Sequence, residues 1–186
     1  ALIVLLAFSA WFSATETAYT SFSTVRMRRM SAKKRTARIA LSLSSDFNKV
    51  LTTLLIGNNI VNIAAASIST VIFTSLVGAS LGPTISTVVL TVAILIFGEV
   101  TPKTLAREAP EKFARVMAYP LLVCTWLFYP LNIIFGLWKK LIFWMFRLNK
   151  KKPSYTEEEF KMLVSDVKKE GVLNETEHDL IERTLR

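Results

Sequence analysis

The feature that most constrains this chain is a block of 49 consecutive residues, Val50 to Gly98, that contains no Asp, Glu, Lys, Arg or His. A helix needs only about 20 apolar residues to cross a bilayer, so the block is long enough for two crossings. A turn-forming run at 78–83 (GASLGP) divides it. The sequence therefore predicts a membrane protein with spans over 50–77 and 84–106.

A further span is predicted at the start of the chain. Residues 1–23 are apolar apart from Glu16 and several hydroxyls, and the segment is too long and too polar for the apolar part of a signal peptide. The chain opens without Met and stops at Arg186 inside an amphipathic pattern. We expect it to be a piece of a longer protein.

Charge predicts the orientation of these spans. The 186 residues carry a formal net charge of +9, although 52% of them are hydrophobic. Basic residues are enriched in short cytoplasmic connections, so the basic segments and the C-terminus should lie in the cytoplasm. The first residue and the 78–83 turn should lie outside. We expect the protein to be in the plasma membrane. The basic residues that follow the first and third spans are Arg26, Arg28, Arg29, Lys33, Lys34, Arg35 and Arg38, then Lys103, Arg107, Lys112 and Arg115.

The apolar segment 116–138 is ambiguous, because basic residues flank it on both sides. Pro120 and Pro130 interrupt it, and Trp126 and Trp138 are of the type enriched at the headgroup level. Charge asymmetry favours a re-entrant hairpin or a juxtamembrane belt. Hydropathy alone favours the alternative, a fourth span.

The tail has a different composition. From Tyr155 onward it holds nine acids and five cations. Thr156 with Glu159, and Asn174 with Glu177, form capping boxes that predict two short helices. We expect an all-α membrane protein with a transmembrane domain at 1–152, followed by an acidic cytosolic helical connector at 153–186 that packs on a domain absent from this chain.

Polar residues inside the spans indicate a cation site. Ser9 and Ser13 share a helix face, as do Asn58 and Asn62, with Gly57 allowing close approach of a neighbouring backbone. Pro102 has no N–H to donate to the Gly98 carbonyl four residues back, which is expected to leave that oxygen free beside a buried Glu99 carboxylate. These are hard oxygen ligands, which suit Mg²⁺ or Na⁺. The predicted metal ligands are Ser9, Ser13, Asn58, Asn62, Gly98 and Glu99.

Each of these residues also has a structural explanation. Serines pack between membrane helices, and asparagines bridge them. Glu16 can pair with a cation near the cytoplasmic face. A disulfide framework, a zinc site and an enzyme are not expected, since Cys124 and His178 are single and no nucleophile has a base beside it. No nucleic-acid binding is expected either, because no aromatic platform interleaves the basic run.

Three motifs, at 12–18 (FSATETA), 57–62 (GNNIVN) and 98–103 (GEVTPK), occur in this order. Together with the tail segments 157–160 (EEEF) and 170–173 (EGVL) they resemble the transmembrane domain of the CorC/CNNM magnesium transporters. The resemblance implies a homodimer, three spans with a juxtamembrane belt, Mg²⁺ efflux coupled to Na⁺ entry, and a following nucleotide-binding CBS pair. It also implies that Ser9, Ser13, Asn58, Asn62 and Glu99 hold the ion.

The expected function is thus Mg²⁺ transport by alternating access, with helix tilting around a kink at Pro102. A site with one carboxylate and several neutral oxygens leaves net positive charge when Mg²⁺ is bound, so it should release the ion readily. The alternative is a membrane scaffold that senses Mg²⁺ without moving it. Ion flux across a membrane distinguishes the two.

Overall fold

The computed structural model describes residues 1–146, and the tail helices expected within 153–186 lie outside that range. Residues 1–139 form one compact unit. Every regular element in the described range is helical, which confirms the all-α prediction. The elements are α1 (Leu2–Ser21), α2 (Thr24–Ser31), α3 (Arg35–Ser45), α4 (Phe47–Val77), α5 (Gly82–Ala93), the π-helix η1 (Ile94–Val100), α6 (Thr101–Glu108), α7 (Pro110–Leu127) and α8 (Tyr129–Met145).

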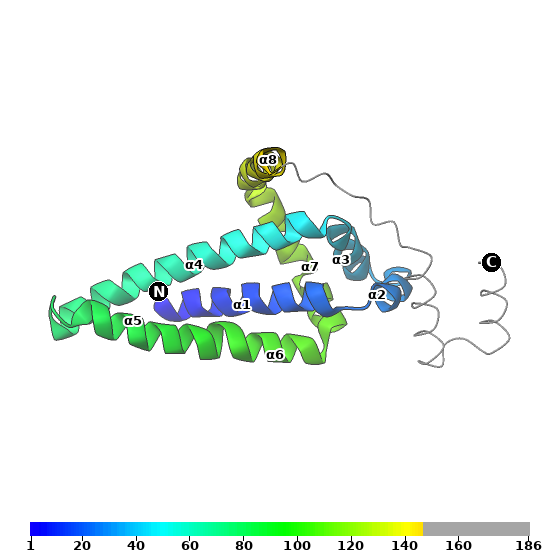
Figure 1. Ribbon diagram of the computed structural model, residues 1–186. Coiled ribbons are helices and arrows are strands. Elements are labelled where there is room, and N and C mark those ends of the chain that lie inside the picture. Colours follow the sequence, from blue (N-terminus) through cyan, green and yellow to red (C-terminus); the bar gives the residue numbers. More distant parts are fainter. Residues whose placement is uncertain (147–186) are drawn as a thin grey trace, which may run out of the picture. The chain divides into compact units, whose positions relative to one another are not determined.

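Three helical stretches are long and apolar enough to cross a membrane: α1, α4, and the 27-residue rod that α5, η1 and α6 form together. They confirm the three predicted spans, with ends shifted by at most a few residues. Helix α1 packs on α4 and on the η1–α6 half of the rod, while α4 also packs on α5. Figure 1 shows that α1 and the rod run in the same direction and that α4 runs against them.

The turn between α4 and α5 is tightly closed. Gly78 adopts φ +92°, a conformation that glycine adopts without the strain of a Cβ. A Cβ on Gly82 would lie 2.5 Å from the Cα of Thr74, so only glycine fits there. One turn further, the Ser86 hydroxyl donates to the Ser69 hydroxyl at 2.8 Å. Backbone contact and a buried hydrogen bond together hold this end of the hairpin shut.

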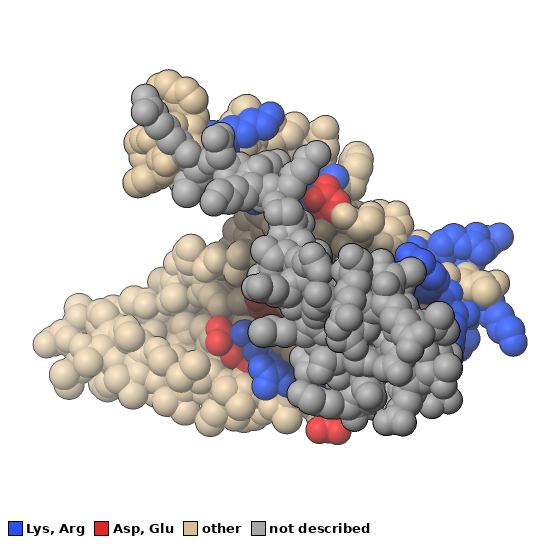
Figure 2. Space-filling model, turned by 45° about the vertical axis from the view of Figure 1, so that its right-hand side comes forward, with Lys and Arg blue, Asp and Glu red and all other residues tan. Residues whose placement is uncertain are grey.

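The basic run after α1 is folded into two helices, α2 and α3, where the sequence predicts only a short connection. Met27 on α2 and Ala37 and Ala40 on α3 are fully buried, because α2 packs on α3 and α3 packs on α7. Figure 2 shows a large group of Lys and Arg side chains at one end of the described surface, with smaller groups elsewhere on it. We call the end formed by α2 and α3 the basic end.

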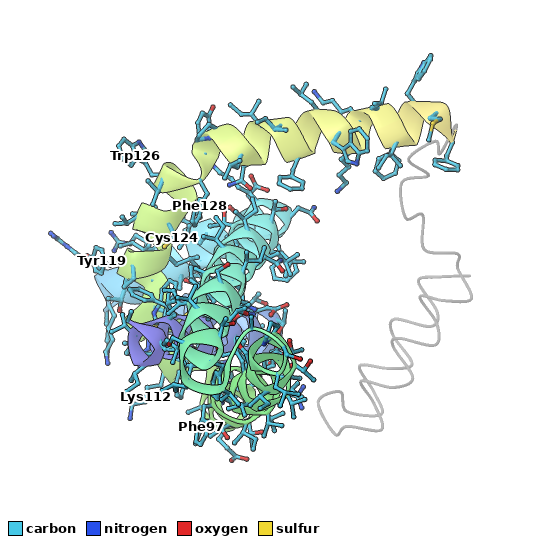
Figure 3. The ribbon with its side chains drawn as sticks, turned by 90° about the vertical axis from the view of Figure 1, so that its left-hand side faces the viewer. Phe97, Lys112, Tyr119, Cys124, Trp126 and Phe128 are labelled. Carbon is cyan, nitrogen blue, oxygen red and sulfur yellow. The ribbon has the colours of Figure 1, made fainter. Side chains whose placement is uncertain are left out.

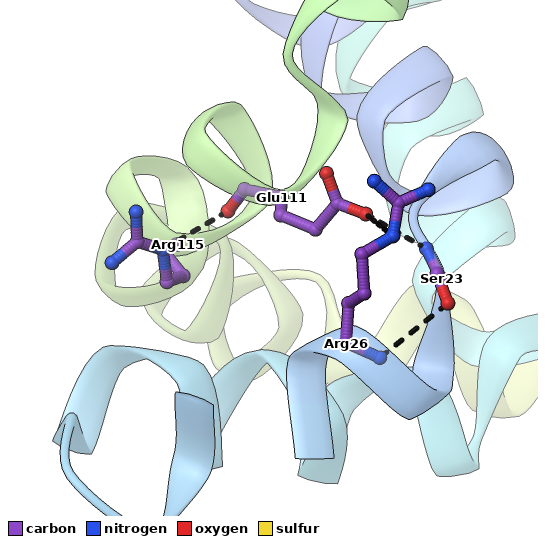
Figure 4. A network of polar contacts seen from close by, with 4 residues as sticks. All are labelled: Ser23, Arg26, Glu111 and Arg115. Carbon is purple, nitrogen blue, oxygen red and sulfur yellow. Dashed lines mark hydrogen bonds and ion pairs between the residues drawn. The ribbon is translucent and has the colours of Figure 1, made fainter. Parts of the chain in front are cut away.

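One acidic side chain ties this end to α7. The Glu111 carboxylate lies 3.2 Å from Nε of Arg26 and accepts a hydrogen bond from the Ser23 backbone N–H at 3.3 Å (Figure 4). Arg115 donates in turn to the Glu111 carbonyl. Arg26 is largely exposed, so the ion pair itself contributes at most about 1 kcal/mol. The backbone bond to Ser23 makes Glu111 a fixed anchor where α1 ends.

The ambiguous segment 116–138 is not one straight helix. Helices α7 and α8 meet at a bend of 69°, and the break falls at Phe128, just before Pro130, while Pro120 lies inside α7. Figure 3 shows Tyr119 and Trp126 pointing away from the three spans, and Trp126 is 79% exposed. A pair bent in this way is either a broken fourth span or a re-entrant arrangement, so both alternatives for this segment stay open.

Candidate ion site

The predicted site residues on α1 and α4 meet in the middle of the bundle. The Ser9 hydroxyl donates to Oδ1 of Asn58 at 3.2 Å, and Ser9 is 1% exposed. The contact joins two antiparallel spans, α1 and α4. A polar pair between membrane helices is stabilising but modest, about 0.6 kcal/mol on average.

The third span reaches the same point through Gly98. A Cβ on Gly98 would lie 2.9 Å from the Ser9 hydroxyl oxygen, so the backbone of η1 approaches Ser9 as closely as a glycine allows. The other close approach, at Gly57, differs from the expectation. Its neighbour is the ring of Phe12 and not a backbone, because the ring fills the gap that the missing side chain leaves. Ser9, Asn58 and Gly98 therefore bring all three spans together.

Two further predicted ligands are buried without partners. The Ser13 hydroxyl and Oδ1 of Asn62 make no hydrogen bond among the described residues, and Ser13 is 1% exposed. Since α1 and α4 are antiparallel, Ser13 lies one turn from the Ser9–Asn58 contact toward the basic end, and Asn62 one turn toward the opposite end. A buried polar group without a partner costs about 1–3 kcal/mol. Nearly all such groups in native proteins are satisfied, and an exception calls for a water, an ion or a functional role.

Glu99 lies in the π-helical segment. Thr101 closes that segment by donating its N–H to the Ile96 carbonyl, five residues back, and Pro102 has no N–H to donate to either Phe97 or Gly98. The Glu99 side chain is partly exposed, and the described residues offer its carboxylate no hydrogen bond or ion pair. This differs from the expectation of a buried carboxylate. Short π-helical segments occur frequently at functional sites, because the extra residue redirects the local backbone carbonyls.

Two other polar residues of the spans lie elsewhere. Asn59 is exposed and donates to the Leu55 carbonyl of its own helix at 2.8 Å, so it faces away from Ser9. Glu16 pairs with Lys103 of α6 at 3.9 Å. Lys103 was considered only as one of the basic residues that set the orientation. Its position four residues after Glu99 was the sequence signal for a role near the site.

The chemistry of the site is oxygen-only. In residues 1–146, no three His, Cys, Asp or Glu side chains gather in a way that could hold a metal. The converging groups are hydroxyls, side-chain amides and backbone carbonyls, with one carboxylate next to them. Such a set suits hard cations. Its low formal charge favours moderate affinity over tight retention.

Fold and site together define a multi-pass membrane domain with a polar, oxygen-lined centre. The family model for the cyclin M transmembrane N-terminal domain matches residues 1–177, and the chain belongs to this family. It is 34% identical to a chloroplastic DUF21 domain-containing protein of Arabidopsis thaliana over 99% of this chain and 28% of the relative. It is also 34% identical to a UPF0053 protein of Haemophilus influenzae, over 89% and 40%.

A third relative is the UPF0053 inner membrane protein YfjD of Escherichia coli. It is 38% identical over 68% of this chain and 28% of its own length. The chain thus spans well under half of the length of each of these three relatives.

Proposed function

We propose that this domain moves Mg²⁺ through the membrane by way of a site between α1, α4 and η1. The observation that supports the proposal most is the pair of buried, unpartnered oxygens on Ser13 and Asn62, on either side of the Ser9–Asn58 contact. Each oxygen lies about one helical turn from that contact, and an ion passing along the path is the simplest group that would satisfy each of them in turn. Glu99 supplies the single formal charge, and the Gly98 carbonyl a backbone ligand.

The ligand chemistry supports Mg²⁺ as substrate. Mg²⁺ prefers six oxygens at about 2.0–2.1 Å and loses its waters reluctantly. Neutral hydroxyl and amide oxygens can replace part of that shell, and a single carboxylate leaves the occupied site positively charged, which favours release. In our proposal Mg²⁺ leaves the cell in exchange for Na⁺, by alternating access, with the rod bending at η1 and Pro102.

The rest of the proposal follows from the family resemblance and the charge pattern. The protein acts as a homodimer in the plasma membrane, with its first residue outside and the basic end in the cytoplasm. The inner membrane location in the name of the Escherichia coli relative is in keeping with this. A cytosolic connector leads to a nucleotide-binding CBS pair. The domain carries no enzymatic activity and binds no nucleic acid.

Flux through proteoliposomes tests this function. Vesicles with wild-type protein should pass Mg²⁺, faster with a Na⁺ gradient than without one. Glu99→Gln should lower the flux at least tenfold, because it removes the only charge of the site while keeping the side-chain shape. Asn59→Ala is the matched control, since Asn59 lies one residue from Asn58 but faces away from the site, and it should leave the flux unchanged.

Two outcomes would contradict the proposal. Undiminished flux with Glu99→Gln would remove that residue from the ion path. Mg²⁺ binding that depends on Glu99 and Asn58, without flux in the full-length protein, would favour the Mg²⁺-sensing scaffold instead.

A further inference from the structure

Lys103 is the basic residue of the third span that is nearest to Glu99 in the sequence. It is four residues after Glu99, and Glu16 is three residues after Ser13. Both Glu16 and Lys103 belong to stretches long and apolar enough to cross the membrane. Charged side chains inside a span cost about 2.5–3.5 kcal/mol even on insertion scales, so they are retained for pairing or for function.

Lys103 has two carboxylates within reach, those of Glu16 and Glu99, and in the structure it pairs with Glu16. Its Nζ lies 3.9 Å from the Glu16 carboxylate, and the two side chains are 34% and 29% exposed. Glu99, one turn back on the same rod, has no such partner among the described residues. Helical side chains lean toward the N-terminus of their helix, which directs Lys103 toward Glu99. A Glu four residues before a Lys is also the favourable order for an ion pair.

We propose that Lys103 is a built-in counter-ion of the ion site that alternates between Glu16 and Glu99. When a cation occupies the site, its charge repels the ammonium group, and Lys103 pairs with Glu16 as in the present structure. When the cation leaves, Lys103 moves to Glu99 and neutralises the carboxylate that the ion has vacated. Lys103 is thus a positioning residue that competes with the transported ion, and this inference rests on the proposed function.

The physical consequence is that the Glu99 carboxylate has two alternative partners during the cycle, the bound cation and the Lys103 ammonium group. Without Lys103, departure of the cation would leave Glu99 charged and alone in a low-dielectric region, where opposite charges attract strongly. The ion would then be held too tightly. An internal ammonium group lowers the affinity and speeds release, while Glu16 holds it away from Glu99 when an ion arrives.

The test measures Mg²⁺ affinity by calorimetry on the full chain in lipid nanodiscs, at fixed ionic strength. Lys103→Met should tighten binding about tenfold and slow Mg²⁺ release. Glu16→Gln should act in the opposite direction and weaken binding about threefold, since Lys103 then pairs with Glu99 permanently. Lys103→Arg keeps the charge and should retain close to wild-type affinity, which excludes a packing effect.

The double variant tests whether Lys103 moves between the two acids or only adds a fixed positive charge near the site. If Lys103 alternates between the two acids, Glu16→Gln should have almost no effect in the Lys103→Met background, because its effect requires the lysine. Equal effects in both backgrounds would overturn the switch, as would unchanged affinity in Lys103→Met. Lys103→Gln serves if Lys103→Met fails to fold. Absence of Mg²⁺ binding in the wild-type protein would instead remove the proposed function, and with it this inference.

Discussion

At the scale of single residues, the site combines polar atoms that hydrogen-bond to one another with buried polar atoms that have no hydrogen-bond partner within residues 1–146. Ser9 and Asn58 form a hydrogen bond, while Ser13 and Asn62 keep a buried oxygen without a partner. An unpartnered buried group lowers the stability of the fold. Such a group can still be useful if the same oxygen atom binds an ion, because the free energy of binding then offsets the lost stability.

Ser13→Ala should therefore separate stability from ion binding. Without Mg²⁺, the free energy of unfolding of the variant should equal that of the wild-type protein or exceed it by up to about 2 kcal/mol, because an unsatisfied hydroxyl is removed. The rise in melting temperature that Mg²⁺ gives through binding to the native state should shrink. Thermal unfolding of the detergent-solubilised protein, with and without Mg²⁺, measures both quantities.

Ser69→Ala is the control for that experiment. Ser69 is equally buried, but its hydroxyl accepts a hydrogen bond from Ser86 at 2.8 Å. Its removal should lower stability by about 1 kcal/mol and leave the Mg²⁺-dependent rise intact. If Ser13→Ala behaved like Ser69→Ala in both respects, Ser13 would be a packing residue and not a ligand.

The site shows how far sequence reasoning reaches. Helical spacing places Ser9 with Ser13, and Asn58 with Asn62, on shared faces, and this follows from the sequence alone. Which member of each pair meets the other helix depends on how far α1 is offset along α4. That offset comes from packing between distant segments, such as the Phe12 ring against Gly57, so local spacing contains no information about it.

At the scale of elements, the third span is a rod with a change of helical register at its centre. The lost donor at Pro102 was evident from the sequence, but a lost donor is compatible with a kink or with a π-helix. The choice depends on contacts with α1, where Gly98 must approach Ser9. Helices α2 and α3 were missed for a related reason. Their few buried residues, Met27, Ala37 and Ala40, are scattered among cations.

Pro102→Ala should convert part of this rod to an ordinary α-helix. The substitution restores an N–H that can donate to the Gly98 carbonyl, which removes that oxygen from any ligand set and rotates Glu99 relative to Ser9. We expect unchanged or higher thermal stability and at least a tenfold loss of Mg²⁺ affinity. Pro110→Ala is the control, since that proline begins α7 outside the site. Unchanged affinity in Pro102→Ala would make the π-helix irrelevant to the ion.

At the scale of the whole molecule, the absence of charge over 49 residues determines most of the architecture. A block of this length is long enough to cross the bilayer twice, which accounts for α4 and the rod, while α1 comes from the apolar start of the chain. The position of the bend between α7 and α8 was harder to predict from the sequence, because two prolines offered two possible break points. The structure uses the one near Pro130, where α8 can place Asn132 within 2.9 Å of the Thr53 hydroxyl on α4.

Single-cysteine labelling tests the proposed orientation. Cys124→Ser removes the native thiol, after which Ser80→Cys in the α4–α5 turn and Ala32→Cys at the basic end report on opposite sides of the membrane. An impermeant maleimide should label the first variant in intact cells and the second only after permeabilisation. The reverse pattern would invert the topology and, with it, the side from which Mg²⁺ enters the site.

The closed turn between α4 and α5 has a mechanical consequence. Gly82 against Thr74 and Ser86 bonded to Ser69 leave the two arms no freedom at that end. The proposed bend of the rod at η1 would leave this end closed, so α4 and the rod could separate only toward the basic end. In the proposed transport cycle, the larger movements would therefore occur at the basic end, and the opposite end would open only through small local rearrangements.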